Sequence, residues 1–472
     1  MRIRLVACAA LSLAAPSLSA QRSLSPQMQS VVSVNSPVVA LTHVRLVDGT
    51  GTPAKDDQTV VIEGEKITAV GKTGDVRVPA GANVIDLSGH TVFPGIIGLH
   101  DHMYYSSAAG GGMKLMLYSY PRLFLSAGVT TIRTAGSVDS YQELNLKKVI
   151  DEGLTMGPEL VVTGPYLQGP GPGPGAMHPV SGPEDARRMV RYWAEEGVTW
   201  FKAYTQISRA DLGAAIDEAH KHGVKVTAHL CSVTFREAVA LGIDNLEHGL
   251  LTNTDYHSGK PQDTCPSGGG ALYAALDVNS ADVQRTLQEM VKKNVSMTST
   301  LAVFETGSPS RVPRDERVLK ALFPAASEAV AQYYERGKTV NDSVSRQALR
   351  RAMDFERAFV RAGGLLAAGS DPCCQSAIAG YADQRNYELL VEAGFTPEQA
   401  IQIMTFNGAK VLGRADRVGS IAAGKQADLV VVRGDLTRTP SDIRNVVTVF
   451  RKGLGYDSAK LTASIAGLVG LR

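Results

Sequence analysis

Hydrophobic and polar residues alternate along both ends of the chain. Short runs of period two, such as "VVALTHVRLVDG" and "QTVVIEGEKITAVG", fill residues 38–95 and are separated by Gly, Asp and Asn. This pattern predicts β-strands joined by turns. The same texture returns in "KQADLVVVRGD" and "RNVVTVFRKG", within residues 412–458. We therefore expect the two ends of the chain to form one composite β-sandwich.

The middle of the chain, residues 96–411, has a different rhythm. Short apolar runs such as "VTWFKAY" and "VKVTAHL" alternate with helical patterns, of which 183–197 and 208–223 are the plainest, and both stop at Gly. Strands that alternate with helices predict a parallel sheet with helices outside it. The number and length of the units predict an α/β fold of the (β/α)8 TIM-barrel type.

Two segments do not fit this rhythm. Residues 251–281, with "SGKPQDTCPSGGG", predict a long surface loop, and residues 310–358 predict charged helices beyond those a barrel needs. Insertions of this size often form lids or substrate walls. The sequence leaves open whether 310–358 closes over a site. Residues 459–472 are expected to be a C-terminal tail.

The N-terminus predicts export. Arg2 and Arg4 precede a short apolar stretch that ends in small residues, so we interpret residues 1–20 as a signal peptide cleaved after Ala20. The stretch is too short to span a membrane. Cys8 lies before most of the apolar residues, which argues against a lipid anchor. We expect a periplasmic or secreted protein without a stable membrane anchor, beginning with a flexible, Ser-rich leader over 21–37.

Composition limits the classes of function that are possible and the residue types that could be metal ligands. The 472 residues carry a formal net charge of +2 and no basic block, which excludes a nucleic-acid partner. Four cysteines follow the signal peptide, too few for a disulfide framework and without a CxxC zinc pattern. Because Cys373 and Cys374 are adjacent, a bridge from one of them to Cys265 stays open. Metal ligands would have to be histidines and carboxylates.

The stretch "TVFPGIIGLHDHMYY" (91–105) places two histidines at the end of an apolar run. His100 and His102 are separated only by Asp101. Side chains alternate faces along a strand, so the two imidazoles point the same way, into the barrel near its carboxyl end. Such a pair can chelate a metal ion. The alternative is a pair of hydrogen-bonded core histidines.

Other apolar runs also end in ligand types. His229 ends "VKVTAHL", His248 lies in "IDNLEHG", and Asp371 follows "GGLLAAGS". A polar side chain at such a position is costly to bury without a partner. Four histidines and a carboxylate that converge on one barrel mouth predict a site of the zinc type.

Lys202 lies in the middle of the strand-like run "VTWFKAY", with Trp200 and Tyr204 on its own face. Lysines are almost never fully buried without a partner. Two interpretations stay open. In one, the ammonium pairs with an acid at the barrel mouth. In the other, which we favour, a lowered pKa lets the neutral amine react with carbon dioxide, and the carbamate bridges two metal ions that stabilise it.

These motifs resemble those of a known family. "VFPGIIGLHDHMYY" resembles the PGxIDxHxH signature of the amidohydrolase superfamily, with Gly98 where that family often has Asp. The order HxH, Lys, His, His, Asp is similar to that of its binuclear members, and "MTFNGAKVLGRADRVGSIAAGKQADLVVV" (404–432) resembles its flanking strands. The resemblance covers residues 38–458. "FKAY" followed by "AHKHGVKVTAHL" most resembles the imidazolonepropionase-like and prolidase-like branch, which includes dipeptidases, N-acyl amino acid carboxypeptidases and ochratoxin-cleaving amidases.

The resemblance implies a metal set and a mechanism. It implies two divalent metal ions, zinc by preference, with one held by His100, His102 and Asp371, the other by His229 and His248, and an N6-carboxylated Lys202 between them. A hydroxide shared by the two ions would be the nucleophile. Asp371 would be the catalytic residue that accepts its proton and passes it to the leaving amine.

Three residues are candidate substrate contacts, each with an alternative. His178 follows the third strand in a Gly/Pro loop and either contacts substrate or is exposed to solvent. Tyr204 either donates a hydrogen bond to a substrate carboxylate or oxyanion, or fills a barrel layer. Arg133, in "TTIRTAGS", pairs either with a ligand carboxylate or with a nearby Glu or Asp. Relatives commonly carry "RD" there, and Thr134 removes any role of that Asp.

We therefore expect a metal-dependent hydrolase of carbon–nitrogen bonds. The expected substrates are small N-acyl amino acids or dipeptides whose carboxylate is held by Tyr204 or Arg133. The alternative is hydrolysis of a cyclic amide, lactone, ester or phosphotriester by the same binuclear centre, because fold alone does not decide among them. A metal-free assembly protein is disfavoured, because all six candidate ligands are present. Relatives also lead us to consider a homo-oligomer.

Overall fold

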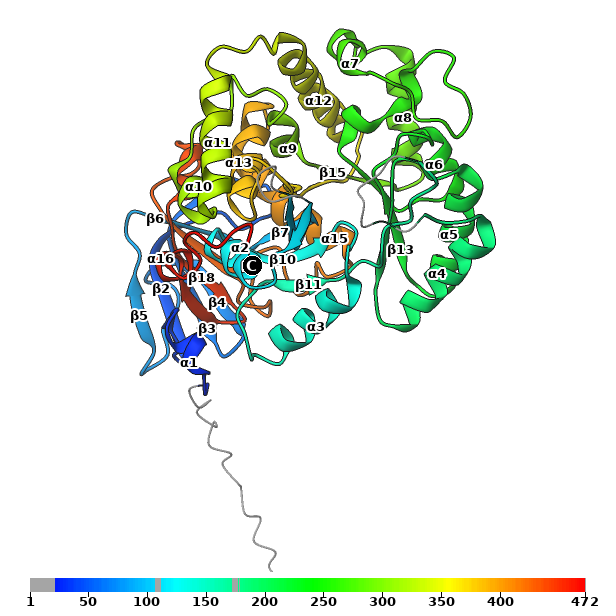
Figure 1. Cartoon of the computed structure of the whole chain (residues 1–472). Helices are drawn as coiled ribbons and strands as arrows, with labels where there is room; N and C mark the ends of the chain where they lie inside the picture. The colour runs from blue at the N-terminus through cyan, green and yellow to red at the C-terminus, as the bar shows by residue number, and fades with distance from the viewer. Residues whose placement is uncertain (1–21, 107–111, 172–176, 178, 472) are drawn as a thin grey trace, which may run out of the picture.

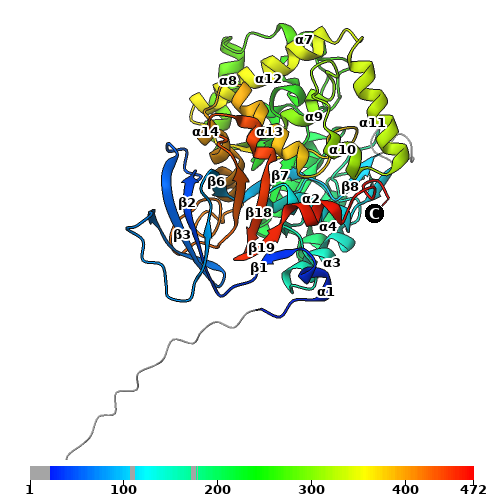
Figure 2. The same ribbon diagram turned by 90° about the vertical axis from the view of Figure 1, so that its left-hand side faces the viewer.

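The computed structural model describes residues 22–106, 112–171, 177 and 179–471. Figures 1 and 2 show a sheet on one side of the molecule and a larger body of parallel strands and helices beside it. The predicted signal peptide lies outside the described residues. Within the described ranges, no helix combines the length and apolarity needed to cross a membrane.

Strands from both ends of the chain form one nine-stranded sheet. Its order is β1-β19-β18-β17-β6-β2-β3-β4, and β5 pairs with β2. The strands are β1 (Val32–Val34), β2 (Val38–Leu46), β3 (Lys55–Glu63), β4 (Lys66–Lys72), β5 (Asn83–Asp86), β6 (His90–Pro94), β17 (Leu429–Arg433), β18 (Val446–Arg451) and β19 (Leu454–Asp457). The join is the antiparallel pair β6–β17, where apolar residues of both strands are buried.

This sheet differs from two sequence predictions. A β-sandwich has two separate facing sheets, whereas all nine strands here belong to one hydrogen-bonded sheet. The contribution of both chain ends is as expected. The predicted flexible leader is also ordered in part, because β1 pairs antiparallel with β19 and Met28 and Val31 are buried. Apolar residues within a Ser-rich segment were enough to fix it to the sheet.

The second body contains eight parallel strands in two groups. The groups are β11-β10-β7 and β12-β13-β14-β15-β16. Their bounds are β7 (Ile96–Asp101), β10 (Val129–Thr134), β11 (Glu159–Val161), β12 (Trp200–Ala203), β13 (Lys225–Ala228), β14 (Asn245–Glu247), β15 (Ser296–Ser299) and β16 (Leu366–Ala368).

Backbone hydrogen bonds join the two groups at both edges. Beyond β11, the Gly164 N–H donates to the Trp200 carbonyl over 2.9 Å, and the Leu167 N–H donates to the Lys202 carbonyl over 2.9 Å. Beyond β16, the Asp371 N–H donates to the His100 carbonyl of β7 over 2.8 Å. A Cβ on Gly369 would lie 2.3 Å from the His100 backbone nitrogen, so this close approach requires glycine.

Helices alternate with the parallel strands and pack around them (Figure 1). They are α2 (Ser119–Ser126), α3 (Ser140–Asp151), α4 (Pro183–Glu195), α5 (Arg209–Lys221), α6 (Phe235–Leu241), α8 (Ala281–Lys292), α12 (Ser343–Arg361), α13 (Tyr381–Glu392), α14 (Pro397–Gln402) and α15 (Gly408–Val411). Helices α4 and α5 occupy the two segments with the plainest helical pattern. The expected C-terminal tail is partly structured, because α16 (Ser458–Ala463) packs on α2.

Both irregular segments contain helices. The predicted loop 251–281 holds short 3₁₀ turns and α7 (Gly270–Ala275), which packs on α12. Residues 310–358 form α10 (Glu316–Ala321), α11 (Pro324–Gly337) and most of α12. Figure 2 shows α7, α8 and α12 at one end of the molecule, away from the nine-stranded sheet.

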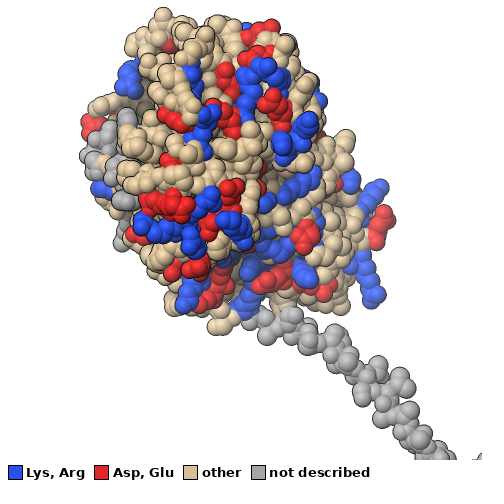
Figure 3. All heavy atoms as spheres, turned by 90° about the vertical axis from the view of Figure 1, so that its right-hand side faces the viewer, with Lys and Arg blue, Asp and Glu red and all other residues tan. Residues whose placement is uncertain are grey.

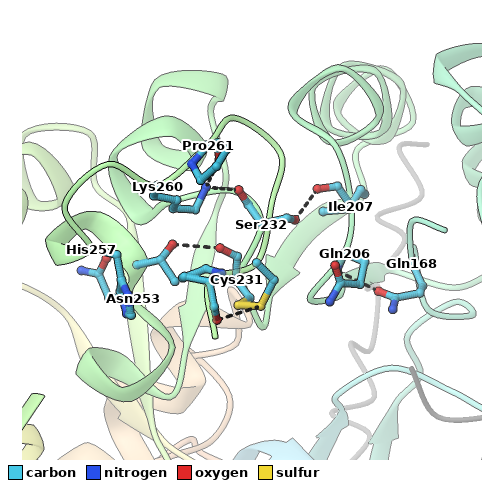
Figure 4. Close-up of a disulfide and its surroundings, with 12 residues drawn as sticks. Gln168, Gln206, Ile207, Cys231, Ser232, Asn253, His257, Lys260 and Pro261 are labelled. Carbon is cyan, nitrogen blue, oxygen red and sulfur yellow. Dashed lines mark hydrogen bonds between the residues drawn. A yellow bond between two sulfur atoms is a disulfide. The ribbon is translucent and has the colours of Figure 1, made fainter. Parts of the chain in front are cut away.

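The disulfide differs from the pairing considered from sequence. Cys265 is bridged to Cys231, with a Cα–Cα distance of 4.9 Å, and not to Cys373 or Cys374, which are free thiols. Figure 4 shows the bridge beside Ser232 and Lys260. The Lys260 ammonium donates to the Ser232 carbonyl and folds the loop back onto the end of β13. That fold-back, which no local pattern encodes, brings Cys265 to Cys231.

Candidate metal centre

The predicted donors lie at the carboxyl ends of five parallel strands. His100 lies at the end of β7 and His102 directly follows that strand. Lys202 lies in β12, and the other three donors follow β13, β14 and β16: His229, His248 and Asp371. The strand ladder continues into these positions. The His229 N–H donates to the Ala203 carbonyl over 3.0 Å and the His248 N–H to the Thr298 carbonyl over 3.0 Å. Each ligand therefore extends from a fixed backbone.

Four imidazoles converge at this end of the strands. The ring centroid of His248 lies 4.3 Å from that of His100 and 4.4 Å from that of His229. The His100 and His102 rings are 5.3 Å apart. Ligand atoms of His100, His102 and Asp371 all lie within 4.8 Å of one another, close enough to bind a single metal ion. The pair in "HDH" points inward, as the strand argument predicted.

Asp371 lies at the centre of this histidine cluster. Its Oδ1 is 3.0 Å from His102 Nε2, and its Oδ2 is 3.6 Å from His100 Nε2. Burial opposes ionisation, but the neighbouring histidines and Lys202 hold the pKa of the Asp371 carboxyl well below its usual range. Both Asp371 and His248 have positive φ, 51° and 68°. Such backbone strain in residues other than glycine is concentrated at functional sites.

Lys202 is buried among the same side chains. It is 1% exposed, and its Nζ lies 3.5 Å from His100 Nε2. Burial, with help from Arg133, lowers the pKa of the Lys202 ammonium to about 8, although Glu247 and Asp371 act in the opposite direction. The ammonium form still predominates near pH 7, but the neutral amine is far more populated than in an exposed lysine, whose pKa is about 10.4.

Three of the histidines, His100, His229 and His248, suit a metal ion because burial keeps them neutral. Burial, followed by Lys202, lowers the pKa of His229 to about 3. Burial likewise holds the pKa of His100 and His248 well below the usual range. His248 Nδ1 lies 2.7 Å from Thr300 Oγ1, but its buried Nε2 has no hydrogen-bond partner among the described residues. An unpartnered, neutral imidazole nitrogen directed at other donors fits a metal ligand.

Glu247 is an important residue that the sequence reasoning missed. Its Oε2 accepts a hydrogen bond from His100 Nδ1 over 2.9 Å, which leaves the lone pair of His100 Nε2 available to a metal ion. Carboxylates in this position orient metal-binding histidines and fix their tautomer. Thr227 also donates to Glu247, over 2.5 Å. The available signal was an acid at the end of the apolar run "IDNLEHG", beside His248.

Arg133 does not lie where a substrate contact was expected. Its guanidinium pairs with Glu247, donates to Asn245 over 3.1 Å, and stacks 4.5 Å from the centre of the Trp200 ring. The residue is 0% exposed. The structure therefore supports the second interpretation of Arg133, pairing with a nearby acid, and removes it from the substrate pocket.

The departure from the family signature at Gly98 has a structural counterpart. A Cβ at Gly98 would collide with the Asp101 carboxylate, which occupies that space. Asp101 Oδ1 accepts a hydrogen bond from Ser370 Oγ over 3.0 Å, and the same hydroxyl lies 2.9 Å from Asp383. Because Ser370 precedes Asp371, Asp101 supports the loop that carries this ligand.

A pocket opens onto the donor cluster. Its described lining is His100, His102, Tyr104, Ser106, Met113, Ala135, Tyr166, Lys202, Tyr204, His229, Asp371, Cys373 and Cys374. The Tyr104 and Tyr166 hydroxyls are 3.0 Å apart, and the Tyr204 ring lies 5.0 Å from that of His229. Burial raises the pKa of the Tyr204 hydroxyl, so it stays a donor. His178 lies outside the described residues.

These observations first define the class of protein to which the chain belongs. Neutral imidazoles, a buried lysine and an ionised aspartate at the carboxyl ends of parallel strands form a metal-binding site of an α/β protein. The particular family follows from the sequence, because the model of the amidohydrolase family matches residues 91–454. The chain belongs to the amidohydrolase family, and this membership implies the TIM-barrel fold.

Curated relatives match only part of the chain. Imidazolonepropionase of Porphyromonas gingivalis is 39% identical over 77 residues, which are 16% of this chain and 18% of that protein. Imidazolonepropionase of Bacteroides thetaiotaomicron is 30% identical over 125 residues, 26% of this chain and 25% of that protein. The aligned segments thus cover a quarter or less of these relatives.

Solved structures match nearly the whole chain. A putative prolidase from Bifidobacterium longum is 25% identical, with a TM-score of 0.66 over 90% of this chain and 95% of that one. The A. niger ochratoxinase is 17% identical, with a TM-score of 0.65 over 91% and 99%. Phenylurea hydrolase B is 19% identical, with a TM-score of 0.67 over 92% and 100%. The last two show similarity of fold alone.

Proposed function

We propose that the protein is a metal-dependent hydrolase that cleaves amide bonds of small molecules. The observation that carries this proposal is the convergence of His100, His102 and Asp371, within 4.8 Å of one another, beside the buried Lys202. A cluster of imidazoles with a carboxylate and an amine is expensive to bury without a ligand. The family supports a hydrolytic role for it.

The proposed metal set is two divalent ions, zinc by preference. His100, His102 and Asp371 would hold one and His229 and His248 the other, with carboxylated Lys202 between them. Bound cations of this kind polarise a carbonyl oxygen and lower the pKa of water. The lowered pKa of Lys202, about 8, favours the neutral amine that carboxylation requires. Glu247 accepts a hydrogen bond from His100 Nδ1 and so leaves His100 Nε2 available as a metal ligand.

Side chains of this chain would handle the proton and orient the substrate. Asp371 is ionised and can accept a proton at a carboxylate oxygen, then release it to the leaving amine. Tyr204 keeps its proton and can donate a hydrogen bond to an acyl oxygen or a carboxylate. The rings of Tyr166 and Tyr204, 5.2 Å apart, supply an aromatic wall for the substrate.

Two substrate classes remain to be separated. The first is small N-acyl amino acids or dipeptides, with the carboxylate on Tyr204. The second is a neutral amide or urea, and it is favoured because Lys202 is the one Lys or Arg among the described pocket residues. With Arg133 committed to Glu247, no guanidinium in that lining is placed to bind a carboxylate.

The test is a hydrolysis screen with matched substrate pairs. Each N-acyl amino acid is compared with its carboxamide, alongside aryl esters, lactones and phosphotriesters. Chelator-sensitive cleavage of an amide, absent in Asp371→Asn, supports the proposal. Turnover limited to esters or phosphotriesters contradicts it. A preference for the free acid over its carboxamide selects the first class, and the reverse selects the second.

The proposed setting is outside the cytoplasm, after removal of residues 1–20. The charged and apolar pattern of that segment supports export, and so does the Cys231–Cys265 bridge, since disulfides persist in oxidising compartments.

A further inference from the structure

Two adjacent thiols form part of the wall of the pocket. Cys373 and Cys374 follow the ligand Asp371 and line the pocket with His102 and Tyr104. Neither belongs to the donor set described above, and neither takes part in the disulfide. A chemical change in these two thiols would therefore alter the wall of the pocket.

The two sulfur atoms are unusually close. Cys373 Sγ and Cys374 Sγ lie 2.7 Å apart. A disulfide bond is about 2.05 Å long, so a small movement brings the two thiols to bonding distance.

The surrounding structure holds the backbone that carries the two thiols. The Ser106 N–H donates to the Cys373 carbonyl over 2.7 Å, and the Ala377 N–H donates to the Cys374 carbonyl over 3.0 Å. On either side of the pair, the Tyr120 hydroxyl donates to the Pro372 carbonyl over 3.0 Å and the Tyr105 hydroxyl to the Gln375 carbonyl over 2.8 Å. The backbone of the loop is therefore held on both sides of the two thiols.

A bond between them would be easily reduced. Adjacent residues have Cα atoms about 3.8 Å apart, shorter than the roughly 4.4–6.8 Å usual for a disulfide. Such a bridge is strained, and strained disulfides have more oxidising potentials than structural ones. The Cys231–Cys265 bridge, with a Cα–Cα distance of 4.9 Å, lies within the usual range. The chain would thus carry two disulfides of different lability.

We propose that Cys373 and Cys374 are a reversible redox modification site, which interconverts between a dithiol and a vicinal disulfide in the pocket wall. In the forward step the two thiols lose two protons and two electrons and form one S–S bond. A disulfide-containing oxidant, such as oxidised glutathione, accepts them, and its S–S bond breaks to give two thiols.

The step changes the chemistry of the pocket beside Asp371. The dithiol offers two weak S–H donors to a bound molecule. The disulfide offers none, and it closes a small ring that stiffens the loop carrying Asp371. The predicted export of the protein favours the oxidised form.

The test measures the mass of one tryptic peptide of the full-length protein. Folded protein is incubated with oxidised glutathione or with a phosphine reductant, denatured in N-ethylmaleimide and digested with trypsin. Cleavage after Arg361 and Arg385 leaves both cysteines on peptide 362–385. After oxidation we expect this peptide without label and lighter than the dithiol by two hydrogen atoms. After reduction we expect two labels.

The relative lability of the two bridges is read in the same digest. As reductant is raised, labels should appear on 362–385 before they appear on Cys231 or Cys265. In Cys374→Ser, checked for folding by its melting temperature, peptide 362–385 should carry a label or a glutathione on Cys373 under all conditions. Two labels on the wild-type peptide after oxidation, a glutathione adduct there, or simultaneous reduction of both bridges would overturn the proposal.

Discussion

At the scale of single residues, Glu247 has two functions. It pairs with the buried Arg133 and accepts the His100 Nδ1 hydrogen bond. Burial alone would raise the pKa of the Glu247 carboxyl, but Arg133 and Lys202 outweigh it and lower the pKa, so the group stays ionised. Glu247 therefore links the stability of the apo protein to the orientation of a metal ligand.

Glu247→Gln should weaken both properties. Removing one partner of a buried pair leaves the other charge uncompensated, so we expect a loss of about 3–5 kcal/mol in the free energy of unfolding. Metal affinity should fall by about 10–100-fold, as for other residues that orient metal ligands. Urea denaturation of the apo protein and competition with a metal-binding dye measure the two effects.

The double variant Arg133→Met/Glu247→Gln separates these effects. Without the guanidinium, the charge that interacts most strongly with Glu247 is gone, so much of the stability should recover while the weaker metal binding persists. A single Glu247→Gln variant that matches the wild type in both measurements would contradict the role assigned to Glu247.

Lys202 gives a second prediction at this scale. Lys202→Met fills a similar volume without an amine, so the chain should fold and bind fewer metal ions than the wild type, with loss of hydrolysis. Lys225→Met, on the exposed start of the neighbouring strand β13, is the matched control. Elemental analysis of both variants checks the prediction, and an unchanged metal content in Lys202→Met would show that Lys202 is not a ligand.

The sequence predicted residue positions better than residue roles. The HxH spacing, Lys202, His229, His248 and Asp371 were found because each ligand type ends or interrupts an apolar run, and the structure brings them together. Glu247 was missed, and the two interpretations of Arg133 were left undecided, because their partnership joins two strands far apart in sequence. A local pattern contains no information about such a pairing.

At the scale of elements, α12 carries a buried carboxyl for which the described residues supply no countercharge. Glu356 is 1% exposed, and burial raises its pKa to about 8, although Ser299 acts in the opposite direction. The folded state therefore keeps the proton to a higher pH than the unfolded chain does. Stability should fall as the pH rises from about 4.5 to about 8, because over this range the unfolded state binds fewer protons.

Glu356→Gln should remove this pH dependence. The neutral amide has no proton to lose, so the variant should gain stability relative to the wild type between pH 5 and pH 8. Urea denaturation at both pH values checks the sign, with Glu328→Gln on the exposed face of α11 as control. A constant difference between variant and wild type across the range would refute the raised pKa.

The loop 251–281 gives another prediction for an element. The Cys231–Cys265 bridge spans 34 residues, and closing a loop of this length stabilises a fold by about 4 kcal/mol. Cys265→Ser should lose about that amount in denaturant, and reductant should bring the wild type to the same value without affecting the variant. Equal stability of the oxidised wild type and Cys265→Ser would contradict a stabilising role.

Elements were predictable where one periodicity dominates. The helical patterns at 183–197 and 208–223 became α4 and α5, and the alternating ends of the chain became strands. The leader and tail were predicted poorly, because β1 and α16 are fixed by contacts with β19 and α2 instead of by their own patterns. The Cys231–Cys265 pairing was not predicted, because it too depends on contacts between distant segments and not on a local pattern.

At the scale of the whole molecule, the chain ends meet on a sheet beside the parallel strands. The pair β6–β17 leads directly into β7, so the sheet anchors the strand that carries His100. Figure 3 shows acidic and basic side chains mixed over one face, in keeping with the formal net charge of +2. Recognition is therefore expected to depend on the pocket and not on a field of one sign.

The central claim is that these converging donors bind two metal ions and use them for hydrolysis. The most direct measurement is the metal content of the purified chain by elemental analysis, before and after a chelator, with amide hydrolysis followed in the same samples. The account predicts about two equivalents of divalent metal per chain, with loss of metal and activity on chelation and recovery of both with zinc. A chain that binds no metal, or one that hydrolyses amides equally well after its metal is removed, would contradict it.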